Sequence, residues 1–515
     1  MARLGYLTFV ALAASYASAL PSTTDYGILE SRGYGKSTLS LIQCLKTKSV
    51  PFYVQQSPDW TEYATTFNSR LQYEPAAIAL PTTVQHISDS VICASNNGIK
   101  VQAKSGGHSY ASYSTGGRDG DLMVDLENFN SISLDDSTGV ATVGAGVRLG
   151  NLALGIWNQG KRALAHGTCP SVGIGGHFTH GGYGYSSRAF GLALDQIVAL
   201  DVVLANGTFV HANPTSYPEV YYVMRGVADA FGIVTTFYLQ TSPAPPTVIQ
   251  WSYDLPQALT SVSAAVDTFK KVQTFALNAS AVDRNLGFGV TIANNATSFT
   301  VHGTYFGTEA HFNTTIAPAL LEGLPTPAPD SSVEVVDWIT SLTLLGGAAT
   351  LAEPLHGYNE RDNFFAKSVT TTEPFPDDAL TSFFSYVLNE GAKPPVSWFS
   401  IINLYGGPDS QILKYNESFA AYAGHDDLWV IQNYGDVAVN GTYPASGIEF
   451  LDGMNNAMTS KLSEYGAYLN YVDPTYSPAE AHQLYYGEEL YQKLQKLKAV
   501  LDPKNVFSNP QSIQA

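Results

Sequence analysis

A chain of 515 residues is longer than one hydrophobic core usually supports, so we expect about two or three domains. Its formal net charge of -18 argues against nucleic acid and anionic membrane surfaces as partners, because both bind proteins through clustered Lys and Arg. Beyond the N-terminus we find no stretch of about 18 or more uninterrupted apolar residues, so the sequence predicts no membrane-spanning segment.

Residues 1–19 have the three-part plan of a secretory signal peptide. Arg3 is followed by an apolar run from Tyr6 to Ala14 and by small residues up to Ala19. The chain also carries six Asn-x-Ser/Thr acceptors for glycosylation: Asn206, Asn278, Asn295, Asn313, Asn416 and Asn440. We therefore predict a glycosylated protein that is secreted to the extracellular space.

Three cysteines remain for this oxidising compartment, so two can pair and one is left over. Cys44 and Cys93 lie near the start of the mature chain and could form a disulfide. Cys169 lies in a glycine-rich segment that suits the close approach of a ligand. The alternatives for this third cysteine are an unmodified thiol or a link to another chain.

Before residue 110 the chain predicts a strand, a helix and a second strand. Ala76 to Leu80 is apolar and extended, and Thr82 with Gln85 can form a capping box that starts a helix. Lys100 to Ala103 then resumes an extended pattern and leads into a glycine turn.

Further along, the β-branched run Ile197 to Leu204 predicts a strand, and Asn206-Gly207 predicts the tight turn of a hairpin. After Ser242 the proline-rich run Pro-Ala-Pro-Pro indicates a linker into a second domain. We therefore place a first domain at 20–245, with its core at about 73–242, a second domain at 246–459 and a returning segment at 460–515.

The second domain combines strands with helices. Leu286 to Ile292 and Trp398 to Leu404 read as strands, and Gln257 to Lys270 reads as a helix. This mixture is typical of an α+β domain. The tail from Glu480 to Val500 predicts a final helix with one apolar face.

Two glycine-rich segments are the main chemical signal: Ser105 to Ser109, and Gly167 to Gly184. Glycines at this density let backbone N–H groups approach an anion, which favours a pyrophosphate cradle over a pair of ordinary tight turns. His177 and His180 within the second segment could suggest a metal. A zinc site needs a third ligand and usually a helix, which the flanking glycines oppose, so we predict no metal.

Taken together, these motifs resemble the glucooligosaccharide oxidases and berberine-bridge-enzyme-like members of the vanillyl-alcohol-oxidase flavoprotein superfamily. The resemblance rests on Ser105-Gly-Gly-His-Ser-Tyr110, on Gly167-Thr-Cys-Pro-Ser-Val-Gly-Ile-Gly-Gly176, on Arg225-Gly with Phe231-Gly-Ile-Val234, and on the tail from Asp502 to Ser512. It implies an α+β fold with a two-lobed PCMH-type FAD-binding domain, built from the N-terminal half and the C-terminal tail. A substrate domain with an antiparallel sheet flanked by helices completes it.

The resemblance also implies how FAD is held. His108 would bond the 8α-methyl group of the isoalloxazine ring and Cys169 its C6 atom, which would leave Cys44 and Cys93 as the disulfide. Attachment at two points is expected to raise the flavin potential and to fix the ring while the groove stays open. The other cofactor-binding positions are Ser105, Gly106, Gly107, Ser109, Val172, Gly173, Gly175, Gly176, His177, Gly182 and Ile233.

The stretch from Tyr468 to Asp473 resembles the family's catalytic segment, in which the second tyrosine, Tyr471, takes the substrate's hydroxyl proton. A free tyrosine has a pKa of about 10, so its surroundings must tune it. Where relatives carry Gln and Asp, this chain places Ile401 and Asn403, and an amide cannot act through negative charge. Either Tyr471 is tuned in another way, or the substrate is not the usual sugar.

The substrate groove is expected to include Tyr110, Tyr468 and Trp398, whose aromatic faces suit sugar rings. Val172 resembles the residue of oxygen-using members, so O2 is the expected acceptor. We predict an oxidase that moves hydride from an alcohol carbon, the anomeric carbon of an oligosaccharide, to flavin N5 and releases H2O2. The alternatives are an oxidase or dehydrogenase of a small alcohol or natural product, and a secreted carbohydrate-binding protein without a redox role.

Overall fold

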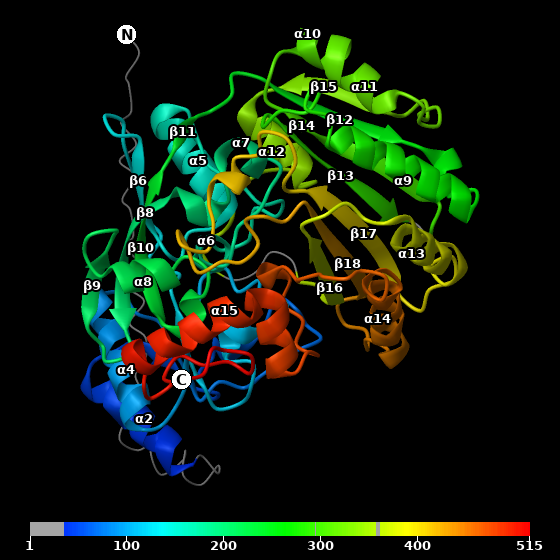
Figure 1. Cartoon of the computed structure of the whole chain (residues 1–515). Helices are drawn as coiled ribbons and strands as arrows, with labels where there is room; N and C mark the ends of the chain where they lie inside the picture. The colour runs from blue at the N-terminus through cyan, green and yellow to red at the C-terminus, as the bar shows by residue number, and fades with distance from the viewer. Residues whose placement is uncertain (1–34, 294, 357–360) are drawn as a thin grey trace, which may run out of the picture.

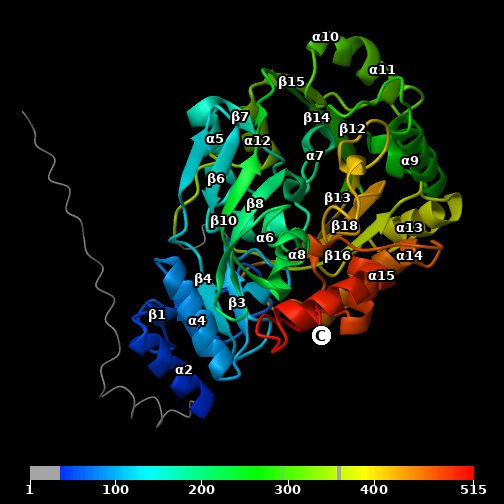
Figure 2. The same cartoon turned by 60° about the vertical axis from the view of Figure 1, so that its left-hand side comes forward.

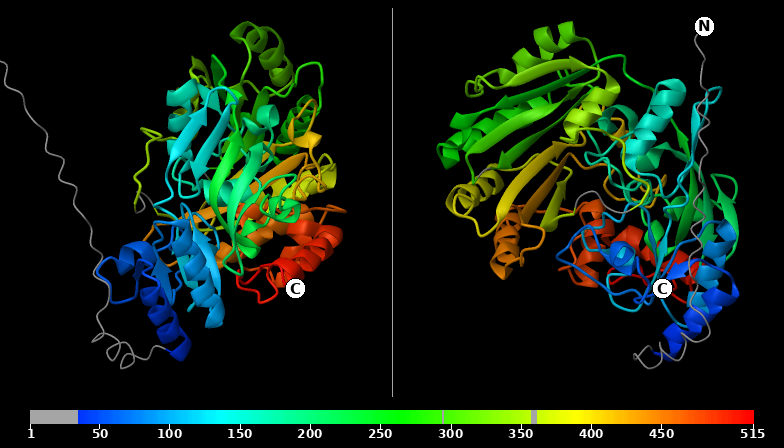
Figure 3. Two further views of the ribbon diagram at one scale, coloured as in Figure 1. Left: turned by 90° about the vertical axis from the view of Figure 1, so that its left-hand side faces the viewer. Right: turned by 180° about the vertical axis from the view of Figure 1, so that it is seen from behind.

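The computed structural model describes residues 35–293, 295–356 and 361–515, so the predicted signal peptide lies outside the described residues. Two lobes are visible, with the N-terminal helices at the end of the molecule farthest from the large sheet (Figures 1 and 3). No helix in these three ranges is both long and apolar enough to cross a bilayer. All six glycosylation acceptors are exposed, although their use stays a prediction.

The first lobe contains both glycine-rich segments and is built on two sheets. The smaller has the strand order β1-β2-β4-β3, with β4 parallel to both β2 and β3. The larger is antiparallel, with the order β5-β6-β10-β8-β9. The strands are β1 (Phe52–Tyr53), β2 (Ala77–Ala79), β3 (Val101–Lys104), β4 (Leu122–Asp125), β5 (Ile132–Asp135), β6 (Val140–Gly144), β8 (Ile197–Leu204), β9 (Phe209–Ala212) and β10 (Gly232–Gln240).

Helices α2 (Lys36–Thr47) and α4 (Val84–Asn96) pack beside the smaller sheet and are joined by the Cys44–Cys93 disulfide, as predicted. The two Cα atoms lie 5.7 Å apart, and the bond closes a separation of 49 residues. The predicted start of α4 was one residue early. Thr83, not Thr82, caps the helix, because its side chain accepts a hydrogen bond from the His86 N–H.

The second lobe is a seven-stranded antiparallel sheet in the order β15-β12-β14-β13-β17-β18-β16. Helices α9 (Val262–Ala276), α13 (Asp377–Asn389) and α14 (Ala445–Thr459) cover one face and bury a continuous apolar core (Figure 1). The strands are β12 (Val248–Asp254), β13 (Leu286–Ala293), β14 (Ser298–Tyr305), β15 (Ser332–Val336), β16 (Asn363–Thr371), β17 (Ser397–Leu404) and β18 (Trp429–Val437). The predicted α+β fold class with a helix-flanked antiparallel sheet is confirmed.

Alternation along β17 decides which side chains can reach the groove between the lobes. Trp398, Ile402 and Leu404 belong to the helix-covered core, so Phe399, Ile401 and Asn403 on the opposite side of the strand face the first lobe. The Trp398 indole N–H donates to the Gly391 carbonyl at 3.0 Å, and its ring lies 6.0 Å from that of Phe450 on α14. The prediction that Trp398 lines the groove is therefore wrong.

The C-terminal helix α15 (Pro478–Leu501) returns to the first lobe and lies below the sheet of the second lobe in Figure 2. Ser477 and Glu480 form a capping box at its start. Lys498 is fully buried at its other end, where its ammonium group pairs with Asp502 at 2.7 Å and donates to two backbone carbonyls. These bonds hold the tail against Ala230, and the Val101 N–H donates to the Val506 carbonyl at 2.9 Å, which joins the tail to the strand before the first glycine segment.

Arg188, on the short helix α7 (Ser187–Phe190), links the two lobes. Its side chain is fully buried, and burial lowers its pKa to about 10. The guanidinium group donates only to backbone carbonyls of the second lobe, those of Asp283, Leu286, Gly406 and Pro408. A planar cation with five donors can serve four carbonyls at once, which an ammonium group cannot do in the same geometry.

We predict that Arg188→Met lowers the free energy of unfolding by about 3–5 kcal/mol, because it leaves two buried and two partly buried carbonyls without their donor. Arg284→Met is the matched control, since Arg284 pairs with Asp409 on the surface, where ion pairs contribute about 0–1 kcal/mol. Thermal melts of both variants test this. Equal melting temperatures for the two would contradict the role given to Arg188.

Candidate active site

The two glycine-rich segments touch through their backbones. A Cβ atom on Gly106 would overlap the backbone nitrogen of Gly173, and one on Gly173 would overlap the nitrogen of Gly106. The Ser105 hydroxyl joins the same contact by donating to the Ala145 carbonyl at 2.6 Å and accepting from the Gly175 N–H at 3.2 Å. Glycine is therefore required at both positions, and the two halves of the predicted cradle form one unit.

Gly176 adjoins this contact and is exposed, and a Cβ atom there would meet nothing within 4 Å. The open space lies next to polar backbone, as a cofactor site requires. Gly107 has a φ of 75°, which glycine adopts without strain. Ser109 follows in a turn, where its hydroxyl accepts from the Tyr113 N–H.

Gly175, Gly176 and His177 lie within the short helix α6 (Ile174–Thr179), although their glycines were expected to oppose a helix. The helix forms because its residues pack into the core of the first lobe, with Ile174 and Phe178 fully buried. His177 is also buried, which lowers its pKa to about 3, whereas His180 pairs with Asp229 at 3.0 Å. Among the described residues, no group of three or more His, Cys, Asp or Glu side chains could hold a metal ion.

His108 and Cys169 bring two nucleophiles to this contact. Burial, with a smaller effect of Arg148, lowers the pKa of His108 to about 3, so the imidazole is neutral at ordinary pH. The Phe67 ring stacks on it, with centroids 3.9 Å apart and planes at 26°. Cys169 is exposed and starts the turn that ends at Val172, whose N–H donates to the Cys169 carbonyl. A neutral imidazole and an exposed thiol beside open space fit the two attachment points expected for a flavin.

Two tyrosines lie close to Cys169. Tyr110 and Tyr471 stack with centroids 5.4 Å apart and planes at 16°. Burial raises the pKa of both phenols, and the nearby Cys169 charge raises them further. The structure therefore brings the predicted base, Tyr471, together with both glycine segments. Tyr471 is only half-buried, so part of its side chain stays accessible.

Tyr468 occupies a different position from Tyr471. It is 3% exposed, and its hydroxyl oxygen accepts from the N–H groups of Gly182 and Tyr183 and from the Asn470 amide, at 2.9, 3.1 and 3.1 Å. Burial raises its pKa, while these hydrogen bonds lower it in part. A buried ring with an engaged hydroxyl offers no face to a sugar, which is at odds with the predicted substrate contact. The Gly182 N–H is likewise directed at Tyr468 and not at a cofactor phosphate.

The buried pair Lys367–Asp473 fixes the end of the segment that carries these tyrosines. The Lys367 ammonium group lies 2.6 Å from Asp473 and 2.8 Å from Asp452. Burial lowers the Lys367 pKa, but the Asp473 charge and the hydrogen bonds outweigh burial and raise it overall. Lys367 therefore stays charged and holds the segment against β16.

Asn403 faces the first lobe from β17, on the same side as Ile401. It is 7% exposed, and within the described part of the chain its Oδ1 atom has no hydrogen-bond partner. Gly289 of the neighbouring strand provides the space, because a Cβ atom there would meet this oxygen at 2.5 Å. A buried acceptor without a donor is suited to a hydroxyl group that brings its own hydrogen.

Sequence reasoning missed Gln432 on β18 and Phe67. The Gln432 amide donates to the Tyr110 hydroxyl at 2.7 Å and so fixes that ring. A polar residue inside the apolar strand Trp429-Val-Ile-Gln432 was the available signal. Ile233 was predicted to contact the cofactor. Its side chain lies in the core beneath β10, so only its backbone can make the predicted contact.

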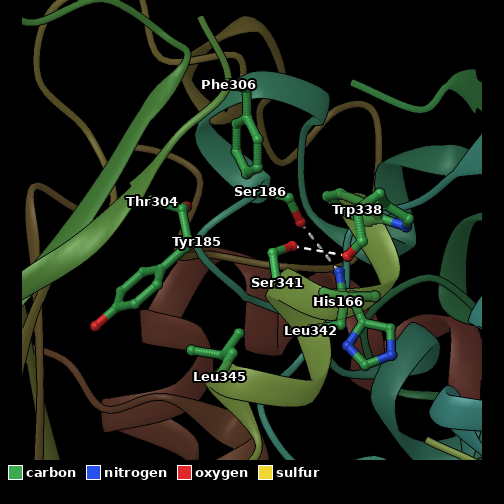
Figure 4. Close-up of a pocket in the computed structure, with 9 residues that line it drawn as sticks. All are labelled: His166, Tyr185, Ser186, Thr304, Phe306, Trp338, Ser341, Leu342 and Leu345. Carbon is green, nitrogen blue, oxygen red and sulfur yellow. Dashed lines mark hydrogen bonds between the residues drawn. The ribbon is translucent and has the colours of Figure 1, made fainter. Parts of the chain in front are cut away.

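A small pocket elsewhere between the lobes is not the substrate groove. Its empty volume of about 230 Å³ includes open solvent (Figure 4). Its walls come from β14, α12 (Trp338–Leu345) and the segments around His166 and Tyr185. His108, Cys169 and Tyr471 are not among its lining residues.

The site can now be compared with known proteins. Residues 75–213 match the family model described as FAD binding domain, and residues 467–514 match the one described as Berberine and berberine like. Xylooligosaccharide oxidase of Thermothelomyces thermophilus is 39% identical over 92% of this chain and 94% of the relative. Chitooligosaccharide oxidase of Gibberella zeae is 36% identical over the same shares.

Among solved structures, glucooligosaccharide oxidase from Acremonium strictum superposes with a TM-score of 0.86 at 33% identity, covering 92% of this chain and 99% of the other. That protein is described as carrying 6-S-cysteinyl, 8α-N1-histidyl FAD. The resemblance read from the motifs is thus confirmed along nearly the whole sequence. The chain therefore belongs to the FAD-linked oxidoreductase family of the oligosaccharide oxidases, in which an FAD-binding domain is joined to a berberine-like C-terminal segment.

Proposed function

We propose that this enzyme is a secreted oxidase that holds FAD covalently through His108 and Cys169 and oxidises the anomeric hydroxyl of an oligosaccharide, with O2 as acceptor. The observation that carries the proposal is the shared site of a neutral His108 imidazole, an exposed Cys169 thiol and the Tyr110–Tyr471 stack. The relatives are named as xylo-, chito- and glucooligosaccharide oxidases, which favours a sugar over a small alcohol.

When bound, the flavin ring supplies the hydride acceptor and passes the electrons on to oxygen. Tyr471 accepts the proton of the substrate hydroxyl at its phenolic oxygen, so that the alcohol carbon can release hydride. Burial raises the pKa of Tyr471, and no carboxylate stands at 401 or 403. Tyr471 can accept this proton only as the phenolate, which is a minor species at neutral pH, so the reaction proceeds through that minor form.

The other residues of the site bind the substrate or orient Tyr471. The Asn403 Oδ1 atom accepts a hydrogen bond from a sugar hydroxyl, which supplies its missing donor. Tyr468 positions Tyr471 by edge-to-face packing, with centroids 4.8 Å apart, from its anchor on the second glycine segment. Val172 borders Cys169 at the face where oxygen is expected to react, which supports an oxidase over a dehydrogenase.

We predict H2O2 release when the purified protein is given xylo-, chito- or cello-oligosaccharides. Oxygen consumption and peroxide formation are measured across this panel, with the double variant His108→Ala/Cys169→Ala as the control that should be inactive. The proposal fails if no oligosaccharide yields peroxide while a small alcohol bleaches the yellow flavin. That result would favour oxidation of a small alcohol or natural product on the same scaffold.

We predict that Tyr471→Phe lowers the rate of flavin reduction by substrate about 10²–10⁴-fold, because the proton acceptor is lost while the flavin remains. In the unmodified enzyme, the raised pKa means that the phenolate fraction grows as pH rises, so kcat/KM should increase toward alkaline pH. Tyr465→Phe, an exposed tyrosine near the same segment, is the matched control.

Anaerobic stopped-flow absorbance measures the rate of flavin reduction by substrate and the dependence of that rate on pH. A Tyr471→Phe rate within about threefold of the unmodified enzyme, or an alkaline increase that survives in this variant, would show that another group takes the proton.

A further inference from the structure

We propose that Phe67 and Asn68 form a positioning segment for covalent flavin attachment, in which Phe67 sets the plane of the His108 imidazole and Asn68 fixes the backbone beyond it. This inference rests on the proposed attachment of FAD at His108. It assigns a role to two residues that lie outside every motif of the flavin family seen in the sequence.

Phe67 is placed to control the direction of the His108 nitrogens. The two rings are stacked at 3.9 Å between centroids, and the edge of Phe67 packs on Phe364 of β16, 6.1 Å away at 62°. The imidazole can rotate about its Cβ–Cγ bond only if its stacking contact with Phe67 is lost. A nucleophile held in one orientation reacts faster than one that rotates, because the entropy cost of aligning it is met before the reaction begins.

Asn68 fixes the chain two residues beyond His108. Its side chain is fully buried, and its amide donates to the Tyr110 carbonyl at 2.7 Å. Its Oδ1 atom accepts from the Arg70 N–H at 3.2 Å and lies 3.5 Å from the Phe364 N–H. The adjacent residues Phe67 and Asn68 thus hold both ends of the segment that carries His108.

The segment itself is anchored on the second lobe. The Asp362 N–H donates to the Phe67 carbonyl at 3.0 Å, and the Ser69 N–H donates to the Asp362 carbonyl at 2.7 Å. Arg70 adds a bond from its side chain to the Phe364 carbonyl at 2.8 Å. Docking of the second lobe therefore fixes the segment that orients His108, so attachment is expected to follow assembly of the two lobes.

Attachment breaks one C–H bond of the 8α-methyl group and the imidazole N–H bond, and it forms the N–C bond. Two electrons and two protons remain on the ring, and O2 removes them as H2O2. The role of Phe67 is confined to orientation, since its ring has no group that can move a proton. Its replacement should slow attachment at His108 and leave attachment at Cys169 unchanged.

The test uses two backgrounds of the secreted enzyme, each with a single possible link. In Cys169→Ala only His108 can hold the flavin, and in His108→Ala only Cys169 can. Phe67→Leu, Phe67→Met and Phe67→Tyr are introduced into each, with Phe209→Leu at an exposed phenylalanine as the control. The readout is the fraction of flavin that stays with the acid-precipitated polypeptide.

In Cys169→Ala we expect Phe67→Leu and Phe67→Met to lower this fraction about threefold to tenfold, whereas Phe67→Tyr restores it, because the aromatic stack is kept. In His108→Ala no Phe67 variant should change the fraction. Equal retention in all variants of the Cys169→Ala background would overturn the inference, and so would equal losses in both backgrounds, which indicate a general effect on folding.

Failure of the proposed function gives a different pattern. If the unmodified enzyme releases all its flavin on acid precipitation, neither link exists and both proposals fall. If it retains flavin but Cys169→Ala alone releases all of it, His108 forms no link and the role given to Phe67 is overturned.

Discussion

The contact between the backbones of Gly106 and Gly173 is the constraint on which the site depends. Because neither position tolerates a Cβ atom, two segments separated by more than 60 residues approach as closely as neighbouring strands. His108 follows one glycine by two positions, and Cys169 precedes the other by four. The contact therefore brings an imidazole and a thiol into one site, which a looser packing of the two turns would not achieve.

A second constraint is the attachment of the two lobes to each other. Arg188 binds four carbonyls of the second lobe from the first, and the segment at Asn68 binds the start of β16. These bonds are buried, so they persist only while both lobes are folded and docked. The face of the large sheet that carries Asn403 and Gln432 is held against the Tyr110–Tyr471 stack in this way.

Much of this arrangement could be predicted from the sequence where a local rule governs it. The strand at 197–204 was predicted with its observed bounds from a β-branched run and an Asn-Gly turn, and the pairing of Cys44 with Cys93 followed from the family resemblance. Predictions failed where burial or register overrides local preference. Helix α6 forms despite its glycines because its apolar residues are buried, and Trp398 lies on the helix-covered face because side chains alternate along β17. Phe67 could not be found, since its partner His108 is distant in sequence, and Gln432 was marked only as a polar residue within an apolar run.

The most direct test of this account is peptide mapping of the secreted protein by mass spectrometry after complete proteolysis. We predict one cross-linked species in which a single FAD joins the peptide containing His108 to the peptide containing Cys169. Recovery of these two peptides separately, both at their unmodified masses, would contradict the claim that the glycine contact positions both residues on one flavin ring.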